Sequence, residues 1–173
     1  MDYTGGTILT TIGRENQDTG NAQWVKSYNF NPTIKSFKIS QNETYIFFSG
    51  YNSGTMEIMM VDTIDGSVAR RVQSTTYKTL EDNVEILPKD DNLGIYMSVY
   101  DGSNNAVICE FIFSGTSLTC FTQDIKGAPT MFALLPSNNL FIGGAQNDGT
   151  GNLYLIKVDF GASTYSWKNQ INC

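Results

Sequence analysis

Two cysteines have the spacing of a covalent cross-link between neighbouring strands. Cys109 lies in an apolar stretch, and Cys120 follows the turn-forming pair Ser114-Gly115. A two-residue turn at that pair would place the two cysteines directly opposite each other, with Cα atoms about 5.5 Å apart and within disulfide range. A bridge indicates an oxidising compartment, and the alternative is two free buried thiols that pack as small hydrophobes. Cys173 is left over, either separated from its partner or free for another chain.

A glycosylation signal points to the same compartment. Asn42-Glu43-Thr44 is an N-x-[ST] sequon without proline at its middle position, whereas Asn31-Pro32-Thr33 is excluded by its proline. The sequon falls in a predicted turn, where a glycan would be exposed. Together with a disulfide it favours secretion. We therefore expect an extracellular or cell-surface protein that carries a glycan at Asn42.

Three polar loops offer oxygen atoms that could contact a ligand. They contain the candidate binding residues Asn52, Asp101, Asn104, Asn147 and Asp148. The two aspartates could donate oxygen ligands to Ca²⁺, but neither loop has the alternating acidic spacing of a calcium loop. Ordinary turn chemistry also accounts for these residues. We expect these loops to gather on one face, and we assign no cofactor and no metal to them.

No catalytic constellation is evident. Histidine is absent, which removes the most common general base near neutral pH and the preferred ligand for zinc, copper or iron. The acidic pairs Glu81-Asp82 and Asp90-Asp91 are interpreted as solvated turn charges. Met56, Met59 and Met60 are interpreted as core-filling side chains. The sequence therefore predicts no catalytic residue and a protein that is not an enzyme.

The overall charge narrows the choice of partners. The 173 residues include 11 basic and 17 acidic side chains, for a net charge of −6. A chain without a cluster of Lys and Arg cannot neutralise phosphates, and it is repelled by anionic lipid headgroups. No stretch approaches the roughly 18 consecutive apolar residues of a membrane span. Nucleic acid and membranes are therefore poor candidate partners.

A repeat determines the elements that must position these residues. Gly20, Gly66, Gly115 and Gly161 recur at intervals of 46 to 49 residues, each within a predicted turn. Runs rich in β-branched and aromatic residues precede the last three glycines and predict strands, with no helical period. The predicted strands are 34–39, 45–49 and 57–61, then 84–87, 95–99 and 106–113, then 131–135, 140–143 and 153–158. With a fourth strand after each glycine, every unit has strands A, B, C and D.

Tandem four-stranded units of this length are typical of β-propeller blades. Residues 1–33 supply only two strands, near 7–12 and 23–28, equivalent to C and D. We therefore predict an all-β fold with a half blade over 1–33 and blades over 34–78, 79–127 and 128–173. An open stack leaves bare edges and faces, so we expect another copy of the chain, or the rest of a longer polypeptide, to complete the propeller. An open β-sandwich is the alternative fold.

One segment resembles a known family. Asp18-Thr19-Gly20, followed by Trp24, resembles the Asp-x-x-Thr-Gly-x-x-x-Trp docking motif of quinoprotein-like propellers, and the segment ending at Trp167 is a weaker echo. The resemblance implies that Trp24 and Trp167 dock onto neighbouring blades. The second and third repeats depart from the motif, because Arg70 and Thr119 occupy the position that Trp24 has in the first. The repeats are also similar to those of large secreted or surface proteins of bacteria and protists.

These observations favour a non-enzymatic extracellular scaffold or protein-interaction module within a larger or polymeric assembly. The resemblance leaves open a fragment of a quinoprotein-type dehydrogenase, although the adjacent cysteines of that family are missing. An intracellular adaptor of the WD or kelch type is a further alternative, but its signature dipeptides are not repeated here. Fold alone does not decide among these functions.

Overall fold

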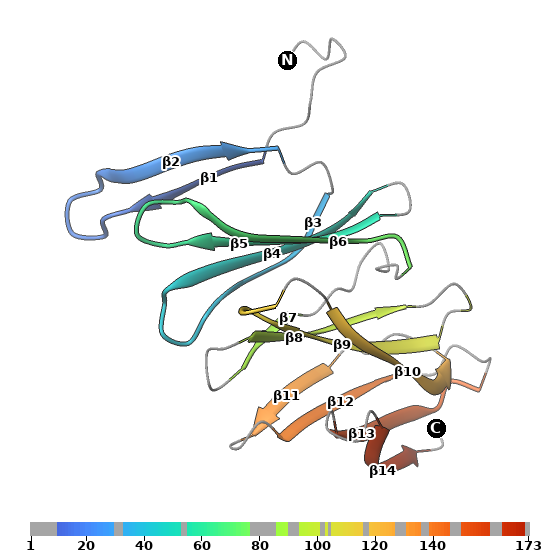
Figure 1. Ribbon diagram of the computed structural model, residues 1–173. Helices are drawn as coiled ribbons and strands as arrows, with labels where there is room; N and C mark the ends of the chain where they lie inside the picture. The colour runs from blue at the N-terminus through green and yellow to red at the C-terminus, as the bar shows by residue number, and fades with distance from the viewer. Residues whose placement is uncertain are drawn as a thin grey trace.

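The protein forms an incomplete β-propeller. The computed structural model describes residues 10–29, 33–52, 55–76, 86–89, 94–100, 103, 105–115, 118–126, 131–135, 139–145, 150–159 and 164–171. Within these ranges the regular structure is entirely β, and the strands form separate small sheets stacked one on another (Figure 1). The predicted all-β, blade-like architecture is confirmed. No helix in the described ranges is long and apolar enough to cross a membrane.

Each sheet follows the order of the chain. The strands are β1 Thr10–Glu15, β2 Ala22–Tyr28, β3 Thr33–Ile39, β4 Tyr45–Asn52, β5 Thr55–Asp62, β6 Val68–Ser74, β7 Ile86–Pro88, β8 Gly94–Tyr100, β9 Asn105–Ile112, β10 Leu118–Lys126, β11 Met131–Leu135, β12 Asn139–Ala145, β13 Leu153–Asp159 and β14 Thr164–Ile171. Antiparallel pairing joins β1 to β2, which we call the half blade. The first blade is β3–β6, the second β7–β10 and the third β11–β14.

Some predicted strand bounds were wrong. The first strand was expected over 7–12, but β1 runs over Thr10–Glu15, and residues 7–9 lie outside the described part of the chain. The strand expected over 106–113 ends at Ile112, because Phe113 already belongs to the following turn. The strand expected over 84–87 is β7, Ile86–Pro88.

The disulfide is present between the two strands that were expected to carry it. Cys109 of β9 pairs directly with Cys120 of β10, and their sulfur atoms are bonded. Their Cα atoms are 4.1 Å apart, closer than the expected spacing. That distance is nearer to the roughly 4.5 Å of a cross-strand pair that exchanges no backbone hydrogen bonds.

The first and second blades each pack against a neighbouring sheet on both faces. On β5, Met56, Ile58 and Met60 point into a core shared with the second blade. Met59 and Val61, at the alternate positions, point into a core shared with the half blade. Successive side chains of a strand point to opposite faces, so a strand covered on both sides is apolar at nearly every position. This explains why the C strands appear as continuous apolar runs.

Candidate functional site

The half blade is attached to the first blade through one turn. Trp24 Nε1 and Arg14 Nη1 each donate a hydrogen bond to the carbonyl oxygen of Thr63, both at 2.9 Å. Tyr28 Oη donates to the carbonyl oxygen of Gly66 at 2.8 Å. Thr63 and Gly66 lie in the turn between β5 and β6. Three side chains of the half blade therefore bind backbone carbonyls of its neighbour.

Local backbone geometry makes this contact close. Gly66 has a φ of 69°, in the left-handed region that favours glycine. A Cβ atom on Gly66 would lie only 2.8 Å from Trp24 Cε3, so the indole packs directly on the turn. Burial, with a smaller contribution from the Asp65 carboxylate, raises the pKa of the Tyr28 hydroxyl. The hydroxyl is therefore protonated at neutral pH and remains a donor.

The next interface uses an arginine where the first uses a tryptophan. Arg70 Nε donates to the carbonyl oxygen of Phe113 at 3.2 Å. Thr63 and Phe113 are each the first residue after a C strand, so Trp24 and Arg70 bind equivalent carbonyls in successive blades. In the sequence alone, Arg70 is a departure from the tryptophan-docking motif. Its position four residues after Gly66, matching that of Trp24 after Gly20, was the signal for this role.

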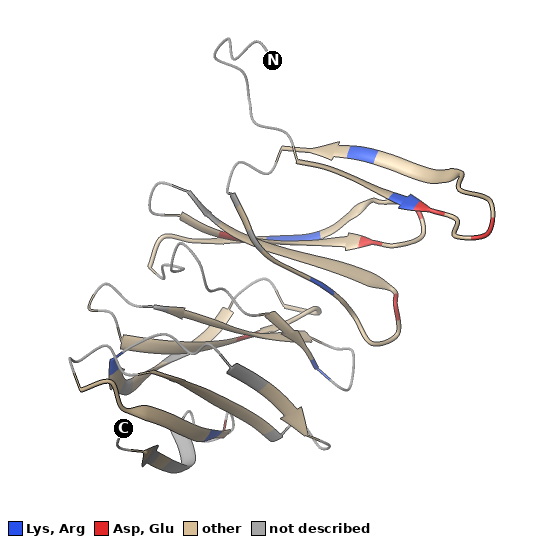
Figure 2. Cartoon of the chain, turned by 180° about the vertical axis from the view of Figure 1, so that it is seen from behind, with Lys and Arg blue, Asp and Glu red and all other residues tan. Residues whose placement is uncertain are grey.

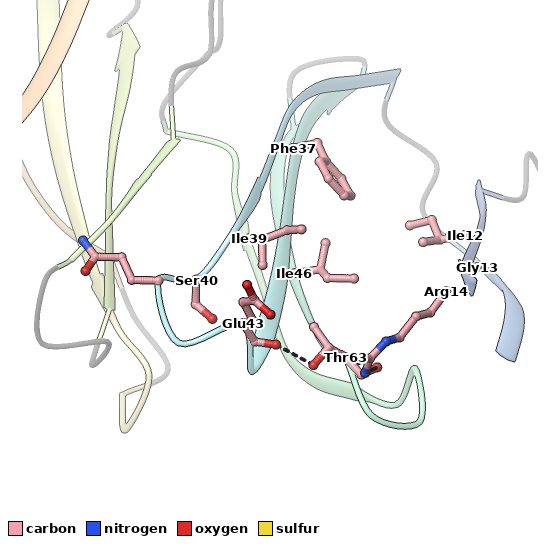
Figure 3. Close-up of a pocket in the computed structure, with 10 residues that line it drawn as sticks. Ile12, Gly13, Arg14, Phe37, Ile39, Ser40, Glu43, Ile46 and Thr63 are labelled. Atoms are coloured by element: carbon pink, nitrogen blue, oxygen red, sulfur yellow. Dashed lines mark hydrogen bonds between the residues drawn. The ribbon is translucent and has the colours of Figure 1, made fainter. Parts of the chain in front are cut away.

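An apolar groove remains open between the half blade and the inner strand of the first blade. Its volume is about 400 Å³. Figure 3 shows Ile12 of β1 pointing toward Phe37 and Ile39 of β3 and Ile46 of β4. Arg14, Glu43 and Thr63 lie at one end, where Thr63 Oγ1 donates to the carbonyl oxygen of Glu43 at 2.6 Å. We call this cavity the inner groove.

The inner groove is open because the half blade covers only the outer strands beneath it. Phe37, Phe48 and Met59 form one cross-strand row from β3 to β5. Their exposed fractions are 48%, 0% and 1%, in that order. The row is therefore half exposed on the inner strand β3 and fully covered on the next strand, β4. The described half blade has two strands, whereas each complete blade has four, so it covers less of the neighbouring sheet.

On the side of β1 away from β2, which borders the groove, no further described strand extends the sheet. β1 pairs with β2 in a two-stranded sheet, and no other described strand joins that sheet. A strand edge of this kind presents backbone N–H and C=O groups that can pair with an added strand. The groove thus combines a hydrogen-bonding edge with an apolar floor.

A polar cavity of about 520 Å³ adjoins the inner groove. It shares Arg14, Ile39 and Glu43 with the groove and is also lined by Glu15 and Asp18. Figure 2 shows acidic residues, in red, at the turn that joins the two strands of the half blade. The carboxylates of Glu15, Asp18 and Glu43 outnumber the single guanidinium of Arg14, so the cavity has an acidic character. Among the described residues, no group of three or more Cys, Asp and Glu side chains is arranged to hold a metal ion.

The buried charges elsewhere are paired. Glu57, 2% exposed, forms an ion pair with Arg71 and accepts a hydrogen bond from Gln73 Nε2 at 3.2 Å. Lys89 Nζ lies 2.7 Å from Glu110 Oε1. These two pairs belong to different blades. Each buried charge thus has one partner of opposite charge, as in an ion pair with a structural role.

The other predicted site residues are placed as follows. Asn42 is exposed in the β3–β4 turn, beside the groove residues Ser40 and Glu43, and its Oδ1 accepts a hydrogen bond from Ser40 Oγ at 2.8 Å. Asn52 ends β4, and Trp167 lies on β14 opposite Lys157. The side chains of Asn52 and Trp167, and all of Asp101, Asn104, Asn147 and Asp148, lie outside the described residues. The binding surface expected at these loops remains a prediction.

Comparison with known proteins identifies the fold. No protein-family model matches the sequence, and no curated protein matches it. An uncharacterised protein of Listeria monocytogenes EGD-e is similar over 98% of this chain and 49% of its own, with 17% identity and a TM-score of 0.57. Hydrazine synthase of Kuenenia stuttgartiensis is similar over 94% of this chain and 43% of its own, with 11% identity and a TM-score of 0.63.

A sialidase, NanB of Streptococcus pneumoniae, is similar over 91% of this chain and 27% of its own, with 11% identity and a TM-score of 0.57. The chain therefore spans half or less of the length of these solved structures. At such identities the likeness concerns the fold and not the activity. The chain shares its architecture with β-propeller proteins.

Proposed function

We propose that the protein is a non-enzymatic extracellular β-propeller scaffold of the tryptophan-docking type, whose half blade receives two further strands in the inner groove. The observation that carries this proposal is the exposure of Phe37 beside the fully buried Phe48 of the same row. The partner is another copy of the chain or the rest of a longer polypeptide. The interaction makes the protein part of a larger or polymeric assembly.

Burial and backbone pairing would both favour this association. Phe37 and Ile39 are 48% and 49% exposed. Complete burial of such a side chain contributes roughly 1.5–3 kcal/mol, so covering the remaining half of each contributes about 1 kcal/mol. Pairing along β1 would add backbone hydrogen bonds and fix the register of the added strand. A two-stranded sheet is marginally stable alone, so the half blade also gains stability.

The docking contacts support a structural role for this end of the molecule. Trp24, Arg14 and Tyr28 hold the half blade against the β5–β6 turn of the first blade. A partly apolar edge suits strand addition, and the described residues that line the groove place no nucleophile beside a general base.

The extracellular part of the proposal rests on the Cys109–Cys120 disulfide and on the exposed sequon at Asn42. Disulfides persist in oxidising compartments and are rare in the cytosol. Non-reducing peptide mapping of protein from its natural source should find the bridge intact and a glycan at Asn42. Two free thiols together with an unmodified Asn42 peptide would contradict secretion.

Strand addition is tested with the chain's own A and B strands. A synthetic peptide with the sequence of residues 33–52 is added to the full chain, and amide hydrogen exchange of residues 10–15 is measured. We expect the peptide to slow exchange along β1, because it supplies the missing ladder partner. The double variant Phe37→Asn, Ile39→Asn should lose this protection.

Val25→Asn is the matched control, because Val25 is 62% exposed on the opposite face of the half blade. This variant should behave as the unmodified chain does. Equal protection in the groove variant and in the control, or unchanged exchange along β1 at saturating peptide, would contradict strand addition in the groove.

A further inference from the structure

The three complete blades share one register, so equivalent residues can be compared. Ile46, Ile95 and Leu140 on the B strands pair with Val61, Phe111 and Val158 on the C strands, respectively. Three positions before these C-strand residues lie Ile58, Ile108 and Leu155. Side chains at these positions point toward the blade that follows. Ile58 packs in the core between the first and second blades, and Ile108 packs in the core between the second and third blades.

Exposure at these equivalent positions changes abruptly in the third blade. Ile58 is 1% exposed and Ile108 is 0% exposed, but Leu155 is 37% exposed. Two residues earlier, Met56 and Ala106 are both fully buried, whereas Leu153 is 39% exposed. In the first two blades the next sheet covers these positions. No described residue covers them in the third blade.

Other apolar side chains extend this uncovered surface. Ile171 pairs with Leu153 across β13 and β14, and it is 51% exposed. Leu135 on β11 is 49% exposed, whereas its neighbour Leu134 packs into the core with the second blade. We call Leu135, Leu153, Leu155 and Ile171 the terminal face. These four aliphatic side chains share the face with Lys157 and Asn169, on a sheet whose other face is already packed.

The interfaces within this chain show which surface fits the terminal face. The second blade meets Met56 and Ile58 with the buried side chains of Ile95, Met97 and Val99. The contact is apolar on both sides. A partner for the terminal face must therefore present aliphatic side chains at equivalent positions of its B and C strands.

The half blade of a second copy does not present such a surface. On its outward face Thr11 Oγ1 and Ser27 Oγ are hydrogen-bonded to each other at 2.8 Å. Gly13 pairs with Val25, and Gln23 is exposed on the same face. This face is mostly polar, and burying it against four aliphatic side chains would desolvate hydroxyl and amide groups without new partners. The two ends of the chain are not complementary.

We propose that the terminal face docks a further propeller blade with an aliphatic incoming face, in tandem register with the third blade. This inference concerns the end of the molecule opposite the inner groove and does not depend on strand addition there. The solved structures of the same fold accord with it, because this chain spans only 49% and 43% of two of them.

The test supplies such a blade to the full chain. A copy of residues 79–127, whose incoming face carries Ile95, Met97 and Val99, is fused after residue 173. We expect Tm to rise by about 5–10 °C and the binding of an apolar fluorescent dye to fall. The matched control is the same fusion with Ile95→Lys and Val99→Lys in the appended copy, which should give neither change. Leu155→Lys in the host chain should abolish the gain.

Several results would overturn the proposal. The control fusion could raise Tm as much as the unmodified one, or the appended blade could exchange its amides as an unfolded segment does. Light scattering could instead find that the 173-residue chain is a dimer which Leu155→Lys converts to a monomer. The terminal face would then be covered by a second copy. A dimer disrupted by Val25→Lys would show that the half blade of a second copy docks there.

Discussion

Replacing Gly66 with alanine tests the contact between the half blade and the first blade. Two costs are expected. Alanine at a φ of 69° costs roughly 1–2 kcal/mol, because its Cβ crowds the following carbonyl oxygen. The same Cβ would lie 2.8 Å from Trp24 Cε3, so the indole must move. Forced displacement in a packed site costs roughly 1–3 kcal/mol. We expect Gly66→Ala to destabilise the chain by about 3 kcal/mol in total.

Gly20→Ala is the control for the backbone cost. Gly20 has a φ of 68°, nearly the same as that of Gly66. A Cβ there would meet only Glu15 Oε1, at 3.7 Å, which is ordinary van der Waals contact. Gly20→Ala should therefore cost roughly 1–2 kcal/mol, from the backbone conformation alone. The difference between the two variants isolates the contact with Trp24.

The assay is urea unfolding followed by far-ultraviolet circular dichroism, in a double-mutant cycle with Trp24→Ala. Without the indole, Gly66→Ala should lose its excess cost and match Gly20→Ala. The coupling energy between positions 24 and 66 should then be on the order of 1–2 kcal/mol. Equal costs for the two glycine variants in the native background, or a cost of Gly66→Ala that does not change without Trp24, would refute the docking geometry.

Three further predictions concern the disulfide, the second docking contact and the buried tyrosine. Reduction of the Cys109–Cys120 bridge, which joins residues 11 apart, should cost about 3 kcal/mol; a reducing agent should lower the Tm of the native chain but not that of the Cys109→Ala, Cys120→Ala variant. Arg70→Gln removes the donor to the Phe113 carbonyl and should cost about 1 kcal/mol in urea unfolding, whereas Arg70→Lys should retain part of this contribution. The raised pKa of Tyr28 means that the folded chain holds the hydroxyl proton more tightly than the unfolded chain does. The resulting stability is present below the ordinary pKa of 10.0 and is lost as pH rises through the folded value, and Tyr28→Phe should abolish this dependence in unfolding curves.

The local features of the fold could be predicted from the sequence. The strands follow from β-branched and aromatic runs between turn residues, and the position of Cys109 opposite Cys120 follows from one short turn. These predictions depend on contacts between residues close in sequence. Their hairpin register is set by turn geometry and by the alternation of side chains.

Contacts between blades could be predicted only in part. The motif resemblance pointed to Trp24, but the carbonyl that its indole binds is at Thr63, which is 39 residues away. Only the position of Arg70, four residues after Gly66, indicated an equivalent donor, because a guanidinium and an indole are different residue types. Both donate N–H groups to a backbone carbonyl. The acceptor is a backbone carbonyl group, which every residue has, so the residue types of the turn do not reveal which carbonyl is bound.

The exposure of apolar residues was decided by the tertiary structure alone. Ile58, Ile108 and Leu155 occupy equivalent positions in the repeat. Nothing in the local sequence explains why Ile58 and Ile108 are buried whereas Leu155 is exposed. The local sequence likewise does not explain why Phe48 is buried and Phe37 is half exposed, although the two residues pair in one row of the first blade. Burial depends on which sheet stacks on a face and on how many strands that sheet has. The sequence by itself therefore determined the strands, their register and the disulfide, whereas only the stacking of the blades decided where the molecule presents open surfaces to a partner.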